Sequence, residues 1–145
     1  GQADRQSLSM LLQTRGSGAI LLLQFIGDIV FQLLVLGKSF SGLGKKLVLT
    51  SREFDRPVVL SDNQDVSCAL LEDNIVAACY TSSVLRIWSA KSPDGVSFDS
   101  FDVGIQMKLL GDNLYILMKT GTINVFSLRF SRFMKQISVP VNTRY

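Results

Sequence analysis

The chain has 145 residues, of which 47% are hydrophobic and only 19% are charged, and its net charge is +3. With a mean hydropathy of +0.28, it is too apolar to be disordered and requires extensive burial or a partner. The charge is too small to indicate nucleic-acid binding by itself.

Histidine is absent from the sequence. This absence removes the commonest general base, the commonest protein metal ligand and every nucleophile that is paired with histidine. Cys68 and Cys79 are too few for a disulfide framework, so we expect a reducing compartment, cytoplasmic or nuclear. The sequence therefore predicts a protein that is not an enzyme, and we expect no catalytic residue, cofactor or metal site.

The N-terminal part of the chain holds one long apolar run. Residues 1–17 are polar, whereas residues 19–36 are almost continuously apolar and long enough to span a bilayer as a helix. Gly27-Asp28 lies at the centre of that run, where an Asp costs roughly 2.5–3.5 kcal/mol on insertion. We therefore favour two buried strands, Ile20–Ile26 and Ile29–Leu36, over a buried helix or a membrane segment.

A glycine- and lysine-rich segment follows at residues 37–46. Its Gly42-Leu43-Gly44-Lys45-Lys46 superficially resembles a phosphate-binding loop, but the Gly-x4-Gly-Lys-Ser/Thr spacing is not met. We expect a flexible basic loop here, then strands at Leu47–Ser51 and Val58–Leu60 and a turn-forming linker at residues 61–65.

From Val66 onward, short apolar runs alternate with turn signals, and no helical period is sustained. This pattern predicts an all-β region with a tight turn at Glu72-Asp73-Asn74 and an end at Pro140. The expected strands are Val66–Leu71, Ile75–Thr81, Val84–Trp88, Val96–Phe101, Ile105–Leu110, Leu114–Lys119, Thr122–Leu128 and Phe133–Val139.

This region contains an internal repeat. Val66–Thr81 aligns with Ile105–Thr120 at an offset of 39 residues (112 − 73), which superposes their Asp-Asn dipeptides. After a one-residue deletion, Val84–Ser89 aligns with Thr122–Ser127. A period just under about 40 residues with four short strands in each unit is typical of propeller blades.

A weaker third copy places Ile20–Gly37 on Val66–Ser83. The predicted organisation is therefore a polar N-terminal segment at 1–17, a poorly matched first blade at 18–60, blades at 66–104 and 105–139, and a tail at 140–145.

Two strands carry a family resemblance. Val84-Leu85-Arg86-Ile87-Trp88 resembles the Val-Arg-Ile-Trp strand of the WD-repeat family, and Thr120–Phe126 is similar to its Asp-Gly-Thr-Ile-x-Val-Trp segment. The Gly-His dipeptide is missing, serines follow Trp88 and Phe126 in place of Asp, and Ser83 and Thr120 replace the turn Asp. The resemblance implies a divergent β-propeller of four-stranded antiparallel blades that lacks the family's usual hydrogen-bond network and binds other proteins.

The chain is short for such a fold. A closed propeller needs at least about four blades, whereas 145 residues allow at most three blades of this period. We therefore expect a fragment, a propeller shared between chains, as a homo-oligomer or with a partner protein, or a small β-sandwich with a repeated hairpin.

Basic and aromatic residues interleave near the C-terminus. The candidate partner-binding residues are Arg129, Phe130, Arg132, Phe133 and Lys135. Such a strip can stack bases or bind phosphates, but alternation of period two also describes a strand with one buried face. We favour the structural interpretation, followed by a protein-binding edge and then by nucleic-acid binding.

Three further features have structural interpretations. We expect Trp88 to lie in the core. We expect Cys68 and Cys79 to be free thiols. They face each other across the hairpin of Val66–Leu71 and Ile75–Thr81 if its turn has two residues. Solvated turn positions are expected for the acidic residues Asp94, Asp99 and Asp102.

The favoured function is a non-catalytic protein-interaction scaffold or adaptor within a larger assembly. The alternatives are a membrane-associated protein that inserts residues 19–36 and a nucleic-acid-binding β domain that uses Arg129, Arg132 and Lys135.

Overall fold

The computed structural model describes residues 31–36, 44, 46–51, 58–62, 64–72, 75–89 and 91–138. All the secondary-structure elements in these ranges are strands, and they form one three-stranded and two four-stranded antiparallel sheets. The first sheet has the order β1-β2-β3, the second β4-β5-β6-β7 and the third β11-β10-β9-β8. The described part of the chain is therefore all-β, as the sequence predicts.

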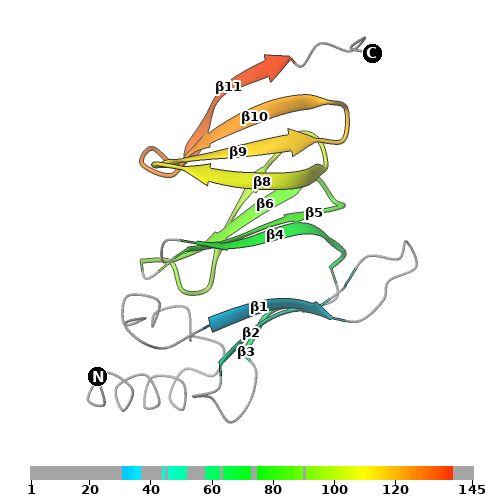
Figure 1. Cartoon of the computed structure of the whole chain (residues 1–145), viewed down its shortest axis with the longest axis vertical. Coiled ribbons are helices and arrows are strands. Elements are labelled where there is room, and N and C mark those ends of the chain that lie inside the picture. The colour runs from blue at the N-terminus through cyan, green and yellow to red at the C-terminus, as the bar shows by residue number, and fades with distance from the viewer. Residues whose placement is uncertain are drawn as a thin grey trace.

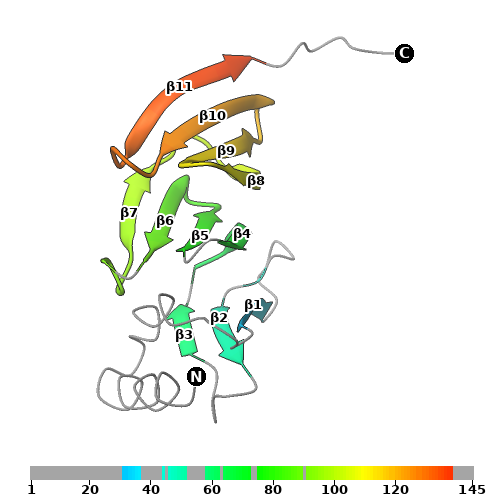
Figure 2. The same cartoon turned by 60° about the vertical axis from the view of Figure 1, so that its left-hand side comes forward.

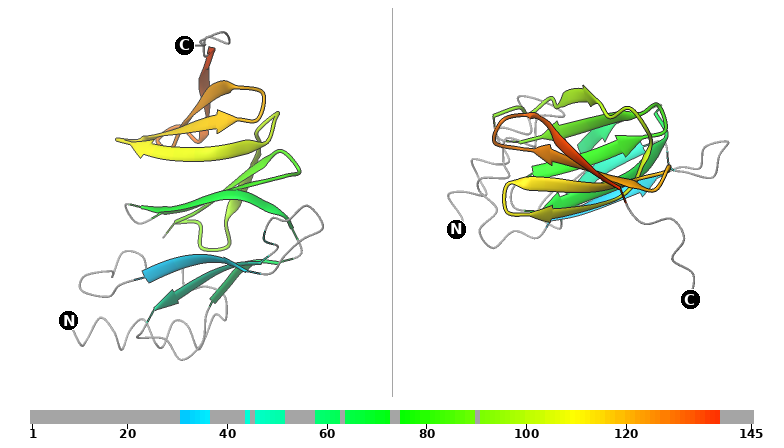
Figure 3. Two further views of the ribbon diagram at one scale, coloured as in Figure 1. Left: turned by 45° about the vertical axis from the view of Figure 1, so that its right-hand side comes forward. Right: turned by 90° about the horizontal axis from the view of Figure 1, so that it is seen from above.

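The three sheets lie face to face as successive layers along the long axis of the molecule (Figures 1 and 3). The strands are β1 (Phe31–Leu36), β2 (Lys46–Ser51), β3 (Val58–Ser61), β4 (Val66–Glu72), β5 (Ile75–Tyr80), β6 (Val84–Trp88), β7 (Val96–Asp99), β8 (Gly104–Leu110), β9 (Asn113–Met118), β10 (Thr122–Ser127) and β11 (Arg132–Ser138).

The apolar run near the N-terminus ends in a strand. Residues 31–36 form β1, which pairs antiparallel with β2, so this part of the run is neither a buried helix nor a membrane helix. Residues 19–30, with the expected first strand and the turn at Gly27-Asp28, lie outside the described residues. Where the chain is described, no helix is long and apolar enough to cross a membrane.

Strand β5 lies at the centre of the stack, and both of its faces are covered. Residues 76–80 are all buried, because alternate side chains of a strand point to opposite sides of its sheet. Val76, Ala78 and Tyr80 pack in a cluster with the first sheet, whereas Ala77 and Cys79 pack in a cluster with the third. A strand that is buried on both faces has a continuous apolar sequence, which explains Ile-Val-Ala-Ala-Cys-Tyr.

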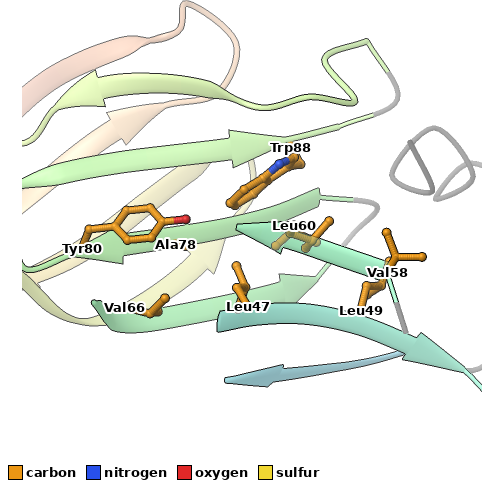
Figure 4. Packing of buried hydrophobic residues seen from close by; sticks show 9 residues of the cluster. Leu47, Leu49, Val58, Leu60, Val66, Ala78, Tyr80 and Trp88 are labelled. Carbon is orange, nitrogen blue, oxygen red and sulfur yellow. The ribbon is translucent and has the colours of Figure 1, made fainter. Parts of the chain in front are cut away.

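The interface between the first two sheets is formed by apolar side chains from β2 and β3 on one side and β4 to β6 on the other. Trp88 is 1% exposed and extends from β6 into this cluster, which confirms its expected place in the core (Figure 4). The buried Tyr80 hydroxyl donates a hydrogen bond to Ser61 Oγ over 2.7 Å. The remaining buried members are Leu47, Leu49, Val58, Leu60 and Val66.

The second and third sheets are joined in the same way by the opposite face of the second sheet. Leu85 and Ile87 of β6 contact a cluster from the third sheet that consists of Leu109, Leu114, Ile116, Met118 and Phe126. Ser67 Oγ also donates a hydrogen bond of 2.6 Å to the Gly104 carbonyl at the start of β8. Each interface therefore buries one apolar face of each neighbouring sheet.

The two four-stranded sheets repeat with a spacing of 38 residues, not 39 as the sequence alignment gives. The pairs Val66↔Tyr80 and Gly104↔Met118 are equivalent, since 104 − 66 and 118 − 80 are both 38, and each is followed by a bulge. Likewise Glu72 pairs with Ile75 as Leu110 pairs with Asn113. The one-residue deletion is therefore not needed, and matching the Asp-Asn dipeptides shifts the first hairpin onto the wrong faces.

The same spacing reaches into the first sheet. Strands β2 and β3 begin at Lys46 and Val58, 38 residues before β6 (84 − 46) and β7 (96 − 58). The pair Leu36↔Lys46 next to the β1–β2 connection is equivalent to Tyr80↔Val84. Leu36 therefore corresponds to Tyr80, an offset of 44 residues (80 − 36), whereas the sequence alignment of Ile20 with Val66 gives 46 (66 − 20). The weak third copy is thus displaced by two residues from that alignment.

The connection between the second and third sheets corrects one predicted strand. Strand β7 ends at Asp99, whereas the sequence predicted a strand through Phe101. Phe101 instead has φ = 64°, a left-handed conformation that a β-strand does not use, and its side chain is 77% exposed. The chain turns here and crosses from β7, an edge strand of the second sheet, to β8, an edge strand of the third.

Gly104 allows the second and third sheets to approach closely. A Cβ atom at this position would lie 2.5 Å from Cys79 Sγ and 2.8 Å from Ile116 Cγ2, and both atoms belong to well-buried side chains. We predict that Gly104→Ala lowers the free energy of unfolding by about 1–3 kcal/mol, because overpacking forces the sheets apart. Urea denaturation measures this change.

A second variant tests the cause of that loss. In the Cys79→Ala background the sulfur that the new Cβ would strike is gone, so Gly104→Ala is expected to cost less there than in the wild type. An equal cost in both backgrounds would show that contact with Cys79 is not responsible.

Candidate functional site

The basic and aromatic strip lies at the turn between β10 and β11 and continues along β11. Phe130 is 57% exposed, and its ring has the guanidinium groups of Arg129 and Arg132 at 5.3 and 5.8 Å from its centroid. The Phe130 amide donates a hydrogen bond to Ser127 Oγ, and Ser131 adopts φ = 54°, which fixes this tight turn. Cation–π contact therefore holds both arginines beside an exposed ring.

Phe133, which the sequence groups with these residues, points the other way. It pairs with Phe126 in the sheet, and the two ring centroids are 5.0 Å apart in an edge-to-face arrangement. Phe126 in turn contacts Phe98 of β7 at 4.7 Å. Phe133 therefore extends the interface with the second sheet and does not line the exposed strip.

A β-bulge determines how the cations of β11 are arranged. Phe133 pairs with Phe126 and Lys135 pairs with Val125, so Met134 has no partner residue on β10. Arg132 pairs with Ser127, two residues from Val125. Arg132 and Lys135 consequently project from the same face of the sheet, although a spacing of three places residues on opposite faces of a regular strand.

That face of the third sheet is directed away from the rest of the molecule (Figure 2). Leu110 and Ile137 are 53% and 38% exposed, and Tyr115, Leu117 and Ile123 are half-buried. The register places these side chains together, since Ile123 pairs with both Leu117 and Ile137. We call this set the open face: Lys108, Leu110, Tyr115, Leu117, Ile123, Lys135 and Ile137. Val125, which pairs with Tyr115 and Lys135, lies on the same side of the sheet but is only 1% exposed.

Sequence reasoning did not find the open face. Its signal was present in β9, where Leu-Tyr-Ile-Leu-Met is apolar at every position as in β5. A strand of this kind is expected to be covered on both sides.

The two cysteines lie opposite each other in the β4–β5 hairpin. Cys68 pairs with Cys79 across the two strands, as a two-residue turn requires, although the turn itself at Asp73-Asn74 lies outside the described residues. Both thiols are free, and Cys79 is completely buried. A hydrogen bond from the Cys79 thiol lowers the pKa of Cys68, and the same hydrogen bond, together with burial, raises the pKa of Cys79.

The pair is expected to react unequally with an alkylating reagent. Because only the thiolate is nucleophilic, iodoacetamide should modify Cys68 first, and its rate should reach half-maximum below pH 9.0, the ordinary pKa of a free cysteine. Mass spectrometry of peptides after short labelling measures both rates.

Cys79→Ala removes the hydrogen-bond donor and should move the half-maximum for Cys68 to higher pH. Faster labelling of Cys79 in the wild type, or an unchanged profile in the variant, would contradict this assignment.

The predicted turn aspartates differ in their contacts. The Asp102 carboxylate is more than a solvated turn former, because it accepts hydrogen bonds from the Thr120 amide and hydroxyl at 3.0 and 2.7 Å. These bonds lower the pKa of Asp102. Asp99 accepts one from the Phe101 amide at 2.8 Å, and Asp94 is exposed. A loop-to-turn link therefore exists in the third sheet, with Thr120 where the WD-repeat family has an Asp.

Other candidate features have structural roles. The Gly44 carbonyl accepts a hydrogen bond of 2.8 Å from the Val66 amide, so this part of the glycine-rich loop joins the first two sheets. Lys46 begins β2, and the rest of the loop lies outside the described residues. Within the described part of the chain, no group of three His, Cys, Asp or Glu side chains could hold a metal ion.

Comparison with known proteins identifies the fold. No family model matches the sequence, and no curated protein does. Solved structures match with TM-scores above 0.5: BamB from Moraxella catarrhalis (0.54, 12% identity, 78% of this chain and 36% of that chain), U3-55K (0.58, 16%, 68% and 35%) and the WD40 repeats of RRP9 (0.57, 14%, 75% and 42%).

These likenesses establish the architecture. The chain has the fold of a partial, divergent WD-repeat-like β-propeller built of antiparallel four-stranded blades. It spans between 35% and 42% of the length of these three propeller structures.

Proposed function

We propose that the chain is a non-catalytic protein-interaction module whose open face packs against a further propeller blade, in its own polypeptide or in a partner. The blade would cover the open face as the third sheet covers the second. An intracellular location, cytoplasmic or nuclear, belongs to this proposal and is supported by the two free thiols.

The observation that carries the proposal is the contrast between the two faces of the third sheet. Toward the second sheet, Leu114, Ile116, Met118 and Phe126 are at most 1% exposed. Toward solvent, the open face leaves the apolar side chains of Leu110 and Ile137 53% and 38% exposed. Apolar surface of this kind gains roughly 25 cal/mol for each Å² that a partner removes from water.

The incomplete size of the propeller supports the same conclusion. A blade contacts only its neighbours, so the last blade of an unclosed stack leaves one face uncovered. Because closed propellers need at least about four blades, and three sheets are described, additional blades would be required to close the ring.

The proposal predicts that the purified chain binds the dye ANS and associates in a concentration-dependent manner, measured by light scattering. Ile123→Lys places a charge on the open face and should reduce both association and dye fluorescence at least several-fold. Circular dichroism should stay β-rich, since Ile123 is outside both buried clusters.

The matched control is Ser82→Lys, which adds the same charge at an exposed turn position and should leave association unchanged. A folded wild-type monomer that neither associates nor binds ANS would contradict the proposal, because its open face would then need no partner.

A further inference from the structure

The positive charge of the chain is concentrated in its C-terminal part. All the acidic residues precede Asn113, whereas five of the 15 basic residues follow Asp112: Lys119, Arg129, Arg132, Lys135 and Arg144. Residues 1–112 consequently carry a net charge of −2 (10 − 12) and the remainder +5. Strand β11 and its turn contribute Arg129, Arg132 and Lys135 to this excess, all of them exposed.

Among the strands that the structure describes, β11 is also the free edge of its sheet. It pairs with β10 on one side, and it stands last in the strand order of the third sheet. Every residue of β11 except Phe133 is exposed. A further blade on the open face would cover the flat side of the sheet, whereas β11 would stay at the outer rim (Figure 2). The main-chain edge of β11 therefore remains accessible when the ring is completed, and Lys135 lies where this edge meets the open face.

Charged residues and a bulge at an edge strand are a common protection against edge-to-edge aggregation. Here the protection works only against positively charged strands, because Arg132 and Lys135 are both cations. Arg132 and Lys135 repel the same edge of a second copy of this chain, but they attract a strand that carries carboxylates. The edge of the second sheet differs in sign, since Asp99 ends β7 and Asp94 lies two residues before its start.

The bulge determines the spacing that such a strand must have. Arg132 and Lys135 pair with Ser127 and Val125, which are two residues apart on β10. Along a strand this separation is about 6.6–6.8 Å, the distance between alternate side chains on one face. Carboxylates at positions i and i+2 of a neighbouring strand would match both cations.

We propose that β11 binds an extended, acidic segment of a partner protein as an added β-strand, with carboxylates at alternate positions opposite Arg132 and Lys135. Main-chain hydrogen bonds to the free edge supply affinity, and the two cations select the side chains. The exposed Phe130 ring, held between Arg129 and Arg132, offers an apolar contact at the end of the strand. This inference rests on the proposed role in protein binding.

A single-stranded nucleic acid fits this site less well. Such ligands need a basic groove with aromatic platforms for successive bases. Phe133 is turned into the sheet interface and offers no platform. The Phe130 ring already has two guanidinium groups, those of Arg129 and Arg132, within 6 Å of its centroid. The three cations of the strip are also few for binding that depends on phosphate neutralisation.

The test uses a fluorescein-labelled peptide of about ten residues that alternates Glu with Val or Thr, and measures its binding to the full chain by fluorescence anisotropy. A second peptide of the same composition has its glutamates adjacent. We expect the alternating peptide to bind at least about fivefold more tightly, and its binding to weaken as salt is raised. Hydrogen exchange should slow in β11 when it binds.

The double variant Arg132→Glu/Lys135→Glu should weaken binding of the alternating peptide at least tenfold. Lys119→Glu makes a single charge reversal at an exposed position between β9 and β10 and should change affinity less than twofold. Circular dichroism checks that both variants are folded.

Equal binding of the two peptides, an unchanged affinity in the double variant, or tighter binding of an oligothymidylate than of the alternating peptide would overturn the inference. The open-face substitution Ile123→Lys separates the two proposals. Suppose that Ile123→Lys abolishes self-association but the wild-type chain does not bind the acidic peptide. Only the assignment of β11 would then be wrong, and the proposed role of the open face would stand.

Discussion

The structure depends on the burial of β5 on both of its faces. Its small residues Ala77 and Ala78 bring two neighbouring sheets close to one backbone, and Tyr80 and Cys79 then extend in opposite directions into the two clusters. Because each cluster needs residues from two sheets, no sheet can bury its apolar surface alone. A Cβ added at Gly104 would lie 2.5 Å from Cys79 Sγ, which shows how little space separates the second and third sheets.

The same requirement accounts for the surfaces that are left over. A stack of two-faced sheets covers every face except those at its ends, so the exposed apolar side chains of the open face follow from the architecture. Its edges follow a different rule, because stacking covers faces and leaves the outer strand of each blade free. We assign assembly with a further blade to the open face and recognition of an acidic segment to the edge of β11, so the two proposed interactions use adjoining surfaces that share Lys135.

Much of this fold can be predicted from the sequence because its strands are short, apolar and separated by turn residues. The Ile-Trp strand of β6 and the Gly121 turn gave the type of repeat, and the eight predicted strands after Val66 all form. The alignment failed by one residue in the first hairpin because the Asp-Asn dipeptides agree by letter, whereas sidedness is set by the register that pairs Glu72 with Ile75. Met134 illustrates a second limit, since a bulge reverses the faces beyond it without a sequence signal of its own. Phe133 thus seemed part of a surface strip although it contacts Phe126.

Amide hydrogen exchange along the chain tests the central claim most directly. If both faces of β5 are covered, the amides of residues 76–80 should open only with the sheets on either side and should exchange among the slowest in the protein, at least a hundredfold more slowly than those of the edge strand β11. Exchange in β5 as fast as in β11 would contradict the account, because it would mean that the stack does not protect the strand at its centre.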